Sequence, residues 1–239
     1  MKKTLLVLAL IAGVSQSVCA GDLSALSSLT QAEFRLVSED LGAALSYKPL
    51  TPTAPLGVTG FDLGLEVTAT DVSKSASALS KAGGGGSTMD TLVIPKFHIA
   101  KGLPFGIDVA AFVSNIPAIN ASLYGGELRY ALIEGGVAVP AVGIRGAFSN
   151  LSGSNQLSFN TRSVDISISK GFAMLTPYAG VGQVWVNSTP NVAGLSSESF
   201  TQSKLFAGAN LNLGLLNLAF EGDKTGNTTS WGLKLGFRW

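Results

Sequence analysis

The last nine residues of the chain alternate between apolar side chains and small or cationic ones. The apolar positions are Trp231, Leu233, Leu235, Phe237 and Trp239. In an extended strand this alternation places every apolar side chain on one face. A strand of this kind that ends in an aromatic residue is typical of the last strand of outer-membrane β-barrels. We expect these five residues to be the signal that the barrel assembly machinery recognises, because the alternative, an edge strand of a soluble sheet, would promote aggregation.

The same alternation recurs upstream in segments of about the 9 to 11 residues that cross a bilayer with tilt. Counted back from Trp239, ten segments begin near residues 57, 90, 106, 121, 137, 156, 175, 203, 216 and 228. Short turns are expected near 101–106, 134–136, 170–175 and 214–215, and longer links near 72–90, 149–155, 188–202 and 223–227. Outer-membrane barrels place short turns in the periplasm and long loops outside. The sequence therefore predicts an all-β fold, a closed antiparallel transmembrane β-barrel of about ten strands over residues 57–239, with twelve strands as the alternative.

The composition agrees with a barrel and not with a helical membrane protein. Beyond residue 20, charged residues or proline interrupt every apolar run before it reaches the roughly 18 to 20 residues of a spanning helix. Yet the chain is 46% hydrophobic and only 13% charged, which is unusual for a soluble surface of this size. A closed barrel reconciles the two observations, because it pairs all of its backbone and alternates lipid-facing with lumen-facing side chains.

The first 20 residues have the pattern of a secretory signal peptide. Lys2 and Lys3 precede an apolar run from Leu5 to Val14, and small residues before Gly21 place cleavage after Ala20. Lipidation at Cys19 is the alternative, although Gln16 fits a lipoprotein site poorly. Cleavage would remove the only cysteine and leave 14 of the 16 basic residues against 15 acidic ones. We therefore expect an exported protein of the outer membrane with no disulfide and no affinity for nucleic acid.

Residues 21–56 are predicted to form an N-terminal appendage. Thr30 and Glu33 match a capping box, and one side of a short helix would carry Leu26, Leu29, Glu33, Leu36 and Val37. Residues 41–47 also alternate, so a helix, an extra strand and a plug all remain open. Three prolines, Pro49, Pro52 and Pro55, separate this segment from the first strand. We favour a position in or under the lumen of the barrel.

Several stretches resemble a group of uncharacterised proteobacterial outer-membrane barrels. They are SEDLGAALSYKPLTP and GFDLGLEVTAT within residues 38–70, then GLPFGID, SKGFAMLTPYAGVG and the ending GFRW. The resemblance runs through most of the mature chain. It implies a fold and a location and carries no activity with it.

The face opposite the apolar one collects charged residues of both signs, which we expect to form a network in the lumen. They are Asp62, Glu66, Lys96, Asp108, Glu127, Arg129, Arg145, Asp165, Lys204, Glu221, Lys234 and Arg238. Buried charges are tolerable only if they pair or stay hydrated. A ten-stranded barrel lies between the packed interior of eight strands and the open channel of sixteen. The network could thus fill the lumen as a structural element or line a narrow, weakly selective pore for small solutes.

Catalysis is not expected. The single histidine, His98, shares the inward face with Lys96, where hydrogen bonding in the lumen is more common than base catalysis. No cluster has the spacing of a metal site, and Gly83–Gly86 lacks the Lys-Ser or Lys-Thr of a phosphate loop, so we expect no cofactor.

Outward aromatic residues are expected to form girdles at the two membrane interfaces. These are Tyr124, Tyr130, Phe148, Tyr178, Phe220, Trp231, Phe237 and Trp239. The expected partners are outer-membrane lipid and the assembly machinery. The function predicted first is a small barrel with a structural or narrow-pore role. The alternative is a surface-binding barrel that contacts an extracellular ligand through flexible loops at 73–90 and 188–202.

Overall fold

The computed structural model describes residues 23–85, 88–116 and 121–239, and the predicted signal peptide lies outside them. Ten strands make up most of the chain, and three short helical elements accompany them. In chain order the elements are η1 (Leu23–Ser28), α2 (Gln31–Leu45), β1 (Phe61–Asp71), α3 (Ala76–Ala82), β2 (Thr91–Gly102), β3 (Ile107–Ile116), β4 (Ala121–Ile133), β5 (Ala141–Ser152), β6 (Leu157–Ser169), β7 (Leu175–Pro190), β8 (Glu198–Leu213), β9 (Leu216–Thr225) and β10 (Thr228–Arg238).

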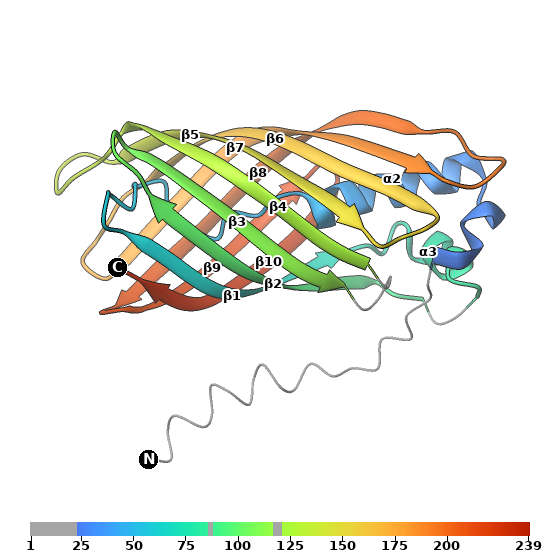
Figure 1. The fold of residues 1–239 in the computed structure, drawn as a ribbon, viewed down its shortest axis with the longest axis horizontal. Coiled ribbons are helices and arrows are strands. Elements are labelled where there is room, and N and C mark those ends of the chain that lie inside the picture. Colours follow the sequence, from blue (N-terminus) through green and yellow to red (C-terminus); the bar gives the residue numbers. More distant parts are fainter. Residues whose placement is uncertain (1–22, 86–87, 117–120) are drawn as a thin grey trace, which may run out of the picture.

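The strands form a closed antiparallel barrel in which β1 pairs with β10. The predicted all-β barrel of ten strands is confirmed, and the alternative of twelve is wrong. At the seam, the backbone amides and carbonyls of Phe61 and Trp239 bond each other, with N···O distances of 2.9 and 3.1 Å, and their rings stack with centroids 5.2 Å apart. We call this end of the barrel the terminal end. The opposite end carries η1 and α3 and is called the helical end (Figure 1).

Most links at the helical end are shorter than predicted, because the strands continue further. β7 and β8 each run for 16 residues, so the link between them shrinks to 191–197, and those at 149–155 and 223–227 shrink to 153–156 and 226–227. At the other end, β1 begins at Phe61 instead of near 57 and β5 at Ala141 instead of near 137. The link at 72–90 is not a plain loop, since it contains α3, which lies against η1. The predicted length is therefore wrong for three of the four longer links.

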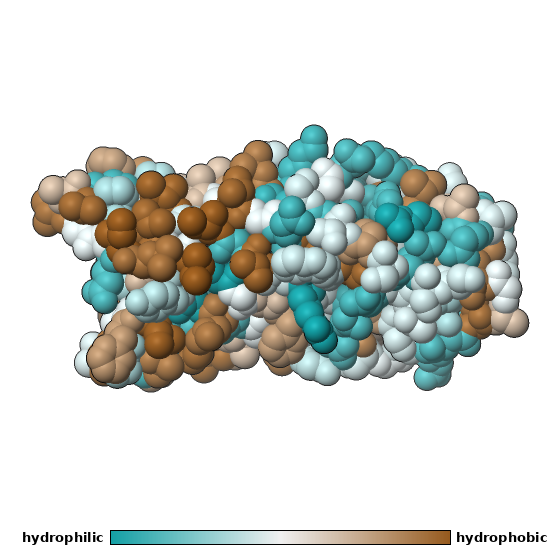
Figure 2. All heavy atoms as spheres, turned by 90° about the horizontal axis from the view of Figure 1, so that it is seen from above, coloured by the Kyte–Doolittle hydropathy of each residue, from teal (hydrophilic) through white to brown (hydrophobic). Residues whose placement is uncertain are grey.

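The polarity of the two barrel faces reverses along the strands. In the terminal half the outward side chains are apolar, as with Val164, Ile166 and Ile168 on β6, and the lumen side is polar. In the helical half of the same strand, Asn160 and Arg162 face outward while Phe159 is buried in the lumen. Figure 2 shows the result on one face, with hydrophobic residues at the terminal end and hydrophilic residues at the helical end.

Because of this reversal, the lumen is apolar in the helical half and polar in the terminal half. The lumen of the helical half is an apolar core, formed by Leu92, Ile94, Leu123, Leu151, Leu157, Phe159, Val184 and Val186. A barrel that is polar outside and apolar inside is suited to water, whereas an apolar exterior around a polar lumen is suited to lipid. The apolar belt of the terminal half therefore marks the part that fits a bilayer.

Two substitutions on β6 test where this belt ends. Ile166→Lys places a cation among Ile144 and Val181, its outward neighbours in register, and we expect it to lower folding stability in bilayers by about 2–4 kcal/mol. Asn160→Lys, on the same strand in the polar half, removes the 3.3 Å hydrogen bond that Asn160 accepts from Asn187 and should cost no more than about 1 kcal/mol. Urea titration of folding into phosphatidylcholine vesicles measures both, and equal losses would contradict the proposed position of the belt.

Candidate functional site: the lumen and its N-terminal plug

Residues 31–56, which we call the plug, run through the lumen from the helical end to the terminal end (Figure 1). The predicted capping box at the start of α2 is confirmed. The Glu33 amide donates to Thr30 Oγ1 at 3.3 Å, and the Thr30 amide donates to Glu33 Oε2 at 2.7 Å. Hydrogen bonds from the Thr30 backbone and from Lys81 lower the pKa of Glu33 from 4.5 to about 2. The helix thus begins at the rim of the barrel, tied to the link that carries α3.

The buried side of α2 packs into the apolar core of the helical half. Phe34, Val37, Leu41 and Leu45 are all at most 1% exposed, and full burial of such side chains stabilises a fold by about 1.5–3 kcal/mol each. Leu36 was predicted on this side but is 43% exposed, because the 3.6-residue period of the helix turns it away. A Cβ at Gly42 would lie 2.8 Å from Val186 Cγ2, so the helix backbone sits directly against β7.

Residues 46–56 follow the helix into the polar half of the lumen without regular structure. Lys48 forms an ion pair with Asp223 at 2.7 Å, and the Leu50 amide donates to Glu221 at 3.2 Å. Thr53 donates to Ser167 at 2.9 Å, and the Leu56 amide donates to Asp108 at 3.0 Å. Residues 46–56 have no partners within a helix or sheet of their own, and side chains of the barrel wall provide their hydrogen bonds and ion pairs instead.

Leu50 has a strained backbone and is fully buried. Its φ of 46° lies in the left-handed region, which costs about 1–3 kcal/mol for a residue with a side chain. The residue is fully buried, and Gly232 on β10 leaves room for it, since a Cβ there would approach Leu50 Cδ2 to 2.8 Å. The surrounding contacts hold the strained conformation in place, which indicates close packing of plug against wall.

Ion pairs between neighbouring strands hold the polar half together. Asp108, Arg129, Arg145 and Asp165 form one row across β3, β4, β5 and β6, so two arginines lie directly opposite each other. Arg129 bonds Asp108 at 3.1 Å through Nε, and Arg145 bonds both Asp165 oxygens at 2.6 and 3.0 Å. Each arginine has a carboxylate on the strand away from the other arginine, and these two ion pairs offset the repulsion between the two guanidinium groups.

The row also serves the plug. Arg129 Nη1 donates to Thr51 Oγ1 at 2.9 Å and to the Pro52 carbonyl at 2.7 Å. The guanidinium therefore joins the wall to the plug as well as β3 to β4.

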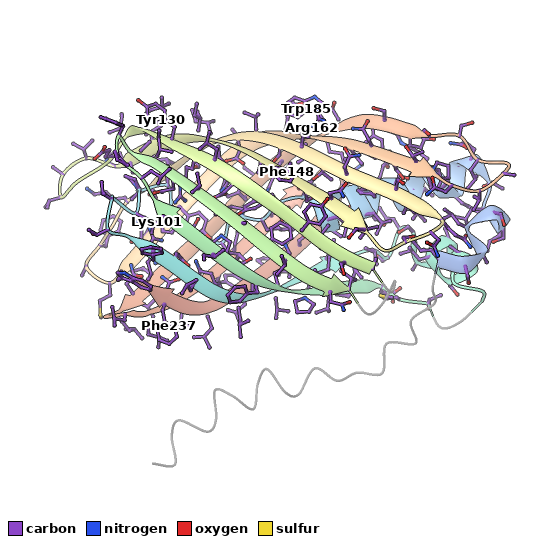
Figure 3. The ribbon with its side chains drawn as sticks, viewed as in Figure 1. Lys101, Tyr130, Phe148, Arg162, Trp185 and Phe237 are labelled. Carbon is purple, nitrogen blue, oxygen red and sulfur yellow. The ribbon has the colours of Figure 1, made fainter. Side chains whose placement is uncertain are left out.

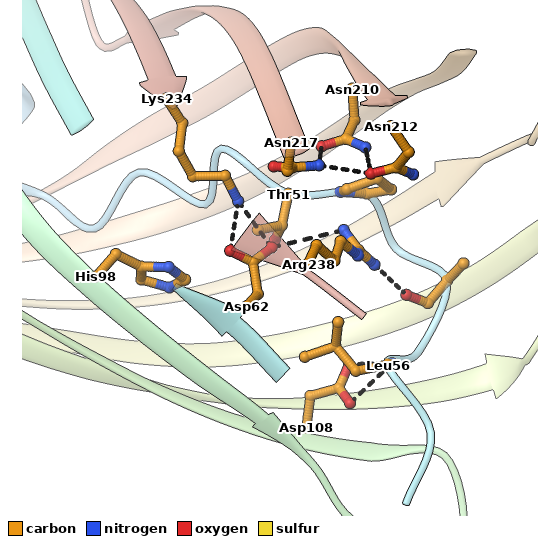
Figure 4. Close-up of polar contacts among 12 residues, drawn as sticks. Thr51, Leu56, Asp62, His98, Asp108, Asn210, Asn212, Asn217, Lys234 and Arg238 are labelled. Atoms are coloured by element: carbon orange, nitrogen blue, oxygen red, sulfur yellow. Dashed lines mark hydrogen bonds and ion pairs between the residues drawn. The ribbon is translucent and has the colours of Figure 1, made fainter. Parts of the chain in front are cut away.

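A second group of charges lies next to the seam between β1 and β10 (Figure 4). Lys234 donates to both oxygens of Asp62 at 2.8 and 3.0 Å, and Arg238 Nη1 lies 3.8 Å from the same carboxylate. Close by, Asn217 donates to Asn210 and to Asn212, both at 2.7 Å. These contacts place polar partners around the point where residues 57–60 leave the lumen for β1.

Three neighbouring groups on β1 and β2 differ from the rest of the lumen. Glu66 and Lys96 lie opposite each other in register, and His98 Nδ1 lies 3.7 Å from Glu66 Oε1. Glu66 Oε1, Lys96 Nζ and both ring nitrogens of His98 are buried, and none has a hydrogen-bond partner among the described residues. No hydrogen bond from residues 31–56 reaches β1 or β2 in the described part of the chain. This side of the lumen is therefore the least tightly bonded to the plug.

The twelve charged residues predicted for the lumen fall into three groups in the structure. All twelve residues face the lumen, and eleven are less than 9% exposed, with Arg238 only partly buried. Seven belong to the wall ion pairs, namely Asp62, Asp108, Glu127, Arg129, Arg145, Asp165 and Lys234, and Arg238 joins Asp62. Lys204 donates to the Tyr47 carbonyl and Glu221 accepts from the Leu50 amide, so both bind the plug. Glu66 and Lys96 form the less bonded group with His98.

Several residues of the site were not predicted. Tyr178 was placed outward with the girdle aromatics, but it is 4% exposed and its hydroxyl donates to Glu221 at 2.9 Å, so that prediction is wrong. Asp223 was assigned to a loop, although it shares the parity of Glu221 on the longer β9. Lys48 lies in an irregular segment with no periodic pattern, so the sequence did not indicate its ion pair with Asp223. Among the described residues, no group of three or more His, Cys, Asp or Glu side chains could hold a metal ion.

Comparisons with known proteins give no family. No family model matches the chain, and no curated protein matches it. The N-terminal β-barrel domain of Pseudomonas aeruginosa OprF is 16% identical with a TM-score of 0.37, and the match covers 74% of this chain and 97% of that one. The KdgM porin is 9% identical with a TM-score of 0.40, covering 74% and 99%. The translocator domain of NalP from Neisseria meningitidis is 11% identical with a TM-score of 0.34, covering 94% and 100%. At these scores the likenesses carry no function to this chain, and the resemblance to uncharacterised barrels stays a prediction.

The ion pairs of the wall can be tested with two arginines in different surroundings. Arg145→Met leaves Asp165 and Glu127 buried without their cation, and we expect a loss of about 3–5 kcal/mol in the free energy of unfolding. Arg162→Met removes an outward guanidinium and should change it by less than about 0.5 kcal/mol. Urea unfolding in zwitterionic vesicles compares the two, and similar losses would contradict a structural role for the Arg145 pairs.

The capping box predicts a dependence on acid. The pKa of Glu33 is about 2 in the fold against an ordinary value of 4.5, so its charge stabilises the fold above pH 4.5 and this contribution disappears as the pH falls through 2. Glu33→Gln keeps the side-chain acceptor but not the charge. We expect the wild type to be more stable than this variant at pH 6 and most of this advantage to be lost near pH 2, as measured by urea unfolding at both pH values. A difference that does not change with pH would exclude the charge as its source.

Proposed function

We propose that this protein is an outer-membrane β-barrel whose lumen is closed by its own plug, with a structural role in the envelope. The apolar belt of the terminal half and the polar exterior of the helical half support insertion in a bilayer. No helix of the described residues is long and apolar enough to span a membrane. Outer-membrane lipid and the assembly machinery, acting through the last strand, are its proposed partners.

The proposal of a closed lumen rests on the contacts that the plug makes in both halves of the barrel. In the helical half, α2 packs into an apolar core that leaves Phe34, Val37 and Leu45 fully buried. In the terminal half, the wall charges bond the plug backbone. Passage of a small solute would require the plug to move, most readily on the less bonded side near Glu66 and Lys96. A narrow pore is therefore a second state and not the resting one.

The helical end is proposed to face outward. Both ends of the sheet, Phe61 and Trp239, meet at the terminal end, as in barrels whose termini lie in the periplasm. At the helical end, η1 and α3 are fixed by hydrogen bonds such as Lys81 to Glu33 at 2.9 Å and Gln156 to the Ser24 carbonyl at 2.7 Å. This ordered cap supports the second candidate function, binding of an extracellular ligand on a rigid surface instead of flexible loops.

Conductance tests the closed state. We expect the refolded mature protein to be silent in planar bilayers and a variant without residues 31–56 to show discrete steps. Because the deletion variant could fail to fold, a second variant keeps the whole chain and fixes the plug to the wall with a cross-link; we call it the locked variant. Ser38 on α2 and Ser188 on β7 share a hydrogen bond of 2.8 Å, so Ser38→Cys with Ser188→Cys can cross-link the plug to the wall.

The reduced and oxidised forms of the locked variant provide matched samples. Any steps that high voltage or urea induces in the reduced form should vanish on oxidation, because the plug can then no longer leave. Persistent conductance in the oxidised form would contradict closure by the plug. Heat-modifiable migration on gels shows that each sample contains a folded barrel.

Surface labelling of cells tests the orientation. Ser27→Cys lies exposed on η1 at the helical end, and Val137→Cys lies fully exposed in the link between β4 and β5 at the terminal end. A membrane-impermeant maleimide should label position 27 on intact cells and position 137 only after the outer membrane is permeabilised. The opposite pattern would reverse the orientation proposed for the barrel.

A further inference from the structure

The outer wall of β3–β6 carries a hollow in the apolar belt. It has a volume of about 750 Å³, and its floor includes the outward positions Ala111, Gly126 and Gly146. A Cβ at Gly146 would meet no atom within 4 Å, so the floor is open to the outside there. Larger apolar side chains border it, namely Val113, Tyr124, Leu128 and Phe148. Such a recess offers an acyl chain more contact than a flat wall does.

The hollow ends at a cation. Arg162 lines its edge and lies between Phe148 and Trp185 in the register of β5, β6 and β7 (Figure 3). Its guanidinium forms no hydrogen bond or ion pair with any described residue. Val164 follows on the apolar side and Asn160 on the polar side, so Arg162 stands where the outward face changes from apolar to polar. In a bilayer this is the level of the lipid headgroups.

A second, polar groove begins at the same arginine. It has a volume of about 630 Å³ and is lined on its outward side by the apolar Val164 together with Arg162, Trp185, Asn187, Ser199 and Thr201. Trp185 is 43% exposed. Above the arginine, Asn150 donates to the Tyr124 hydroxyl at 2.9 Å and Asn187 donates to Asn160 at 3.3 Å. The groove thus combines an exposed aromatic ring with amides and hydroxyls, which are groups that bind sugars.

We propose that the apolar hollow, Arg162 and the polar groove form one binding site for an acylated, phosphorylated glycolipid of the outer leaflet. The acyl chain lies over Gly146, a phosphate accepts hydrogen bonds from the Arg162 guanidinium, and a sugar contacts Trp185. In such a lipid the phosphates are carried by the acylated sugars, above the acyl chains, and Arg162 and Trp185 are likewise direct register partners beside the apolar hollow. This inference rests on the proposed membrane location and on the outward orientation of the helical end.

Competitive lipid binding tests the site. The full mature chain is folded in phosphatidylcholine nanodiscs and titrated with bisphosphorylated lipid A or with its dephosphorylated form, and retained lipid is counted by native mass spectrometry. We expect the wild type to prefer the phosphorylated form about tenfold, since hydrogen bonds to charged groups are strong. Arg162→Gln should abolish this preference and still retain the dephosphorylated form.

Two further variants separate the parts of the site. Gly146→Phe adds a ring at a position where a Cβ meets no atom within 4 Å, so the ring occupies the hollow, and it should reduce retention of both lipid forms about tenfold. Lys224→Gln removes another outward cation, on β9 and away from the hollow, and should leave retention unchanged.

Three outcomes would overturn the proposal. One is equal retention of lipid A by Arg162→Gln and the wild type, and another is no effect of Gly146→Phe. The third is competition by inorganic phosphate alone, which would mean a free-phosphate site instead of a lipid site. Because heat-modifiable migration reports barrel folding separately in each nanodisc sample, a failure of membrane insertion is distinguished from a failure of lipid recognition.

Discussion

The reversal of polarity halfway along the strands is the constraint on which the rest of the structure depends. A barrel surrounded by lipid along its full length needs an apolar exterior throughout, and its lumen is then free to be polar. Here only the terminal half follows this rule. The helical half has its apolar residues inside, and such a core needs a partner to fill it. Helix α2 is that partner, so the plug follows from the way polarity is distributed along the strands.

The polar half of the lumen obeys a different requirement. Buried charges are costly unless each has a close partner, and the wall strands can pair only some of them with each other. Arg129, Glu221 and Lys204 use the peptide groups of residues 46–56 as further partners. The irregular segment also needs partners for its own amides and carbonyls. The wall and the plug therefore satisfy each other, and the plug is an integral part of the barrel. Glu66, Lys96 and His98 are the exception to this mutual arrangement.

Much of the fold could be predicted from alternation alone, because each strand carries a clear apolar face where it meets the belt. β10, with Trp231 to Trp239, is the plainest example. The prediction failed where the pattern reverses. Residues such as Asp223 and Thr225 resemble a turn in the sequence, yet they are buried lumen residues of β9. Tyr178 was assigned to the outer face because aromatic residues are enriched at membrane interfaces. Its hydrogen bond to Glu221 in the lumen could not be foreseen. The alternation at 41–47 suggested a strand, but its small residues serve a helix that touches β7 at Gly42. Contacts between the plug and the wall join residues far apart in the chain, and no local pattern reports them.

The path of the plug has a consequence for assembly. The described chain starts at the helical end, crosses the whole lumen and joins β1 at the terminal end, where β1 meets β10. A closed cylinder cannot easily admit a helix with bulky side chains such as Phe34 after its last seam has formed. In the full chain, closing the seam between the first and last strand after the helix is in place avoids this obstacle. The number of strands and their stagger set the diameter of the cylinder, and residues 31–56 occupy the lumen that they leave.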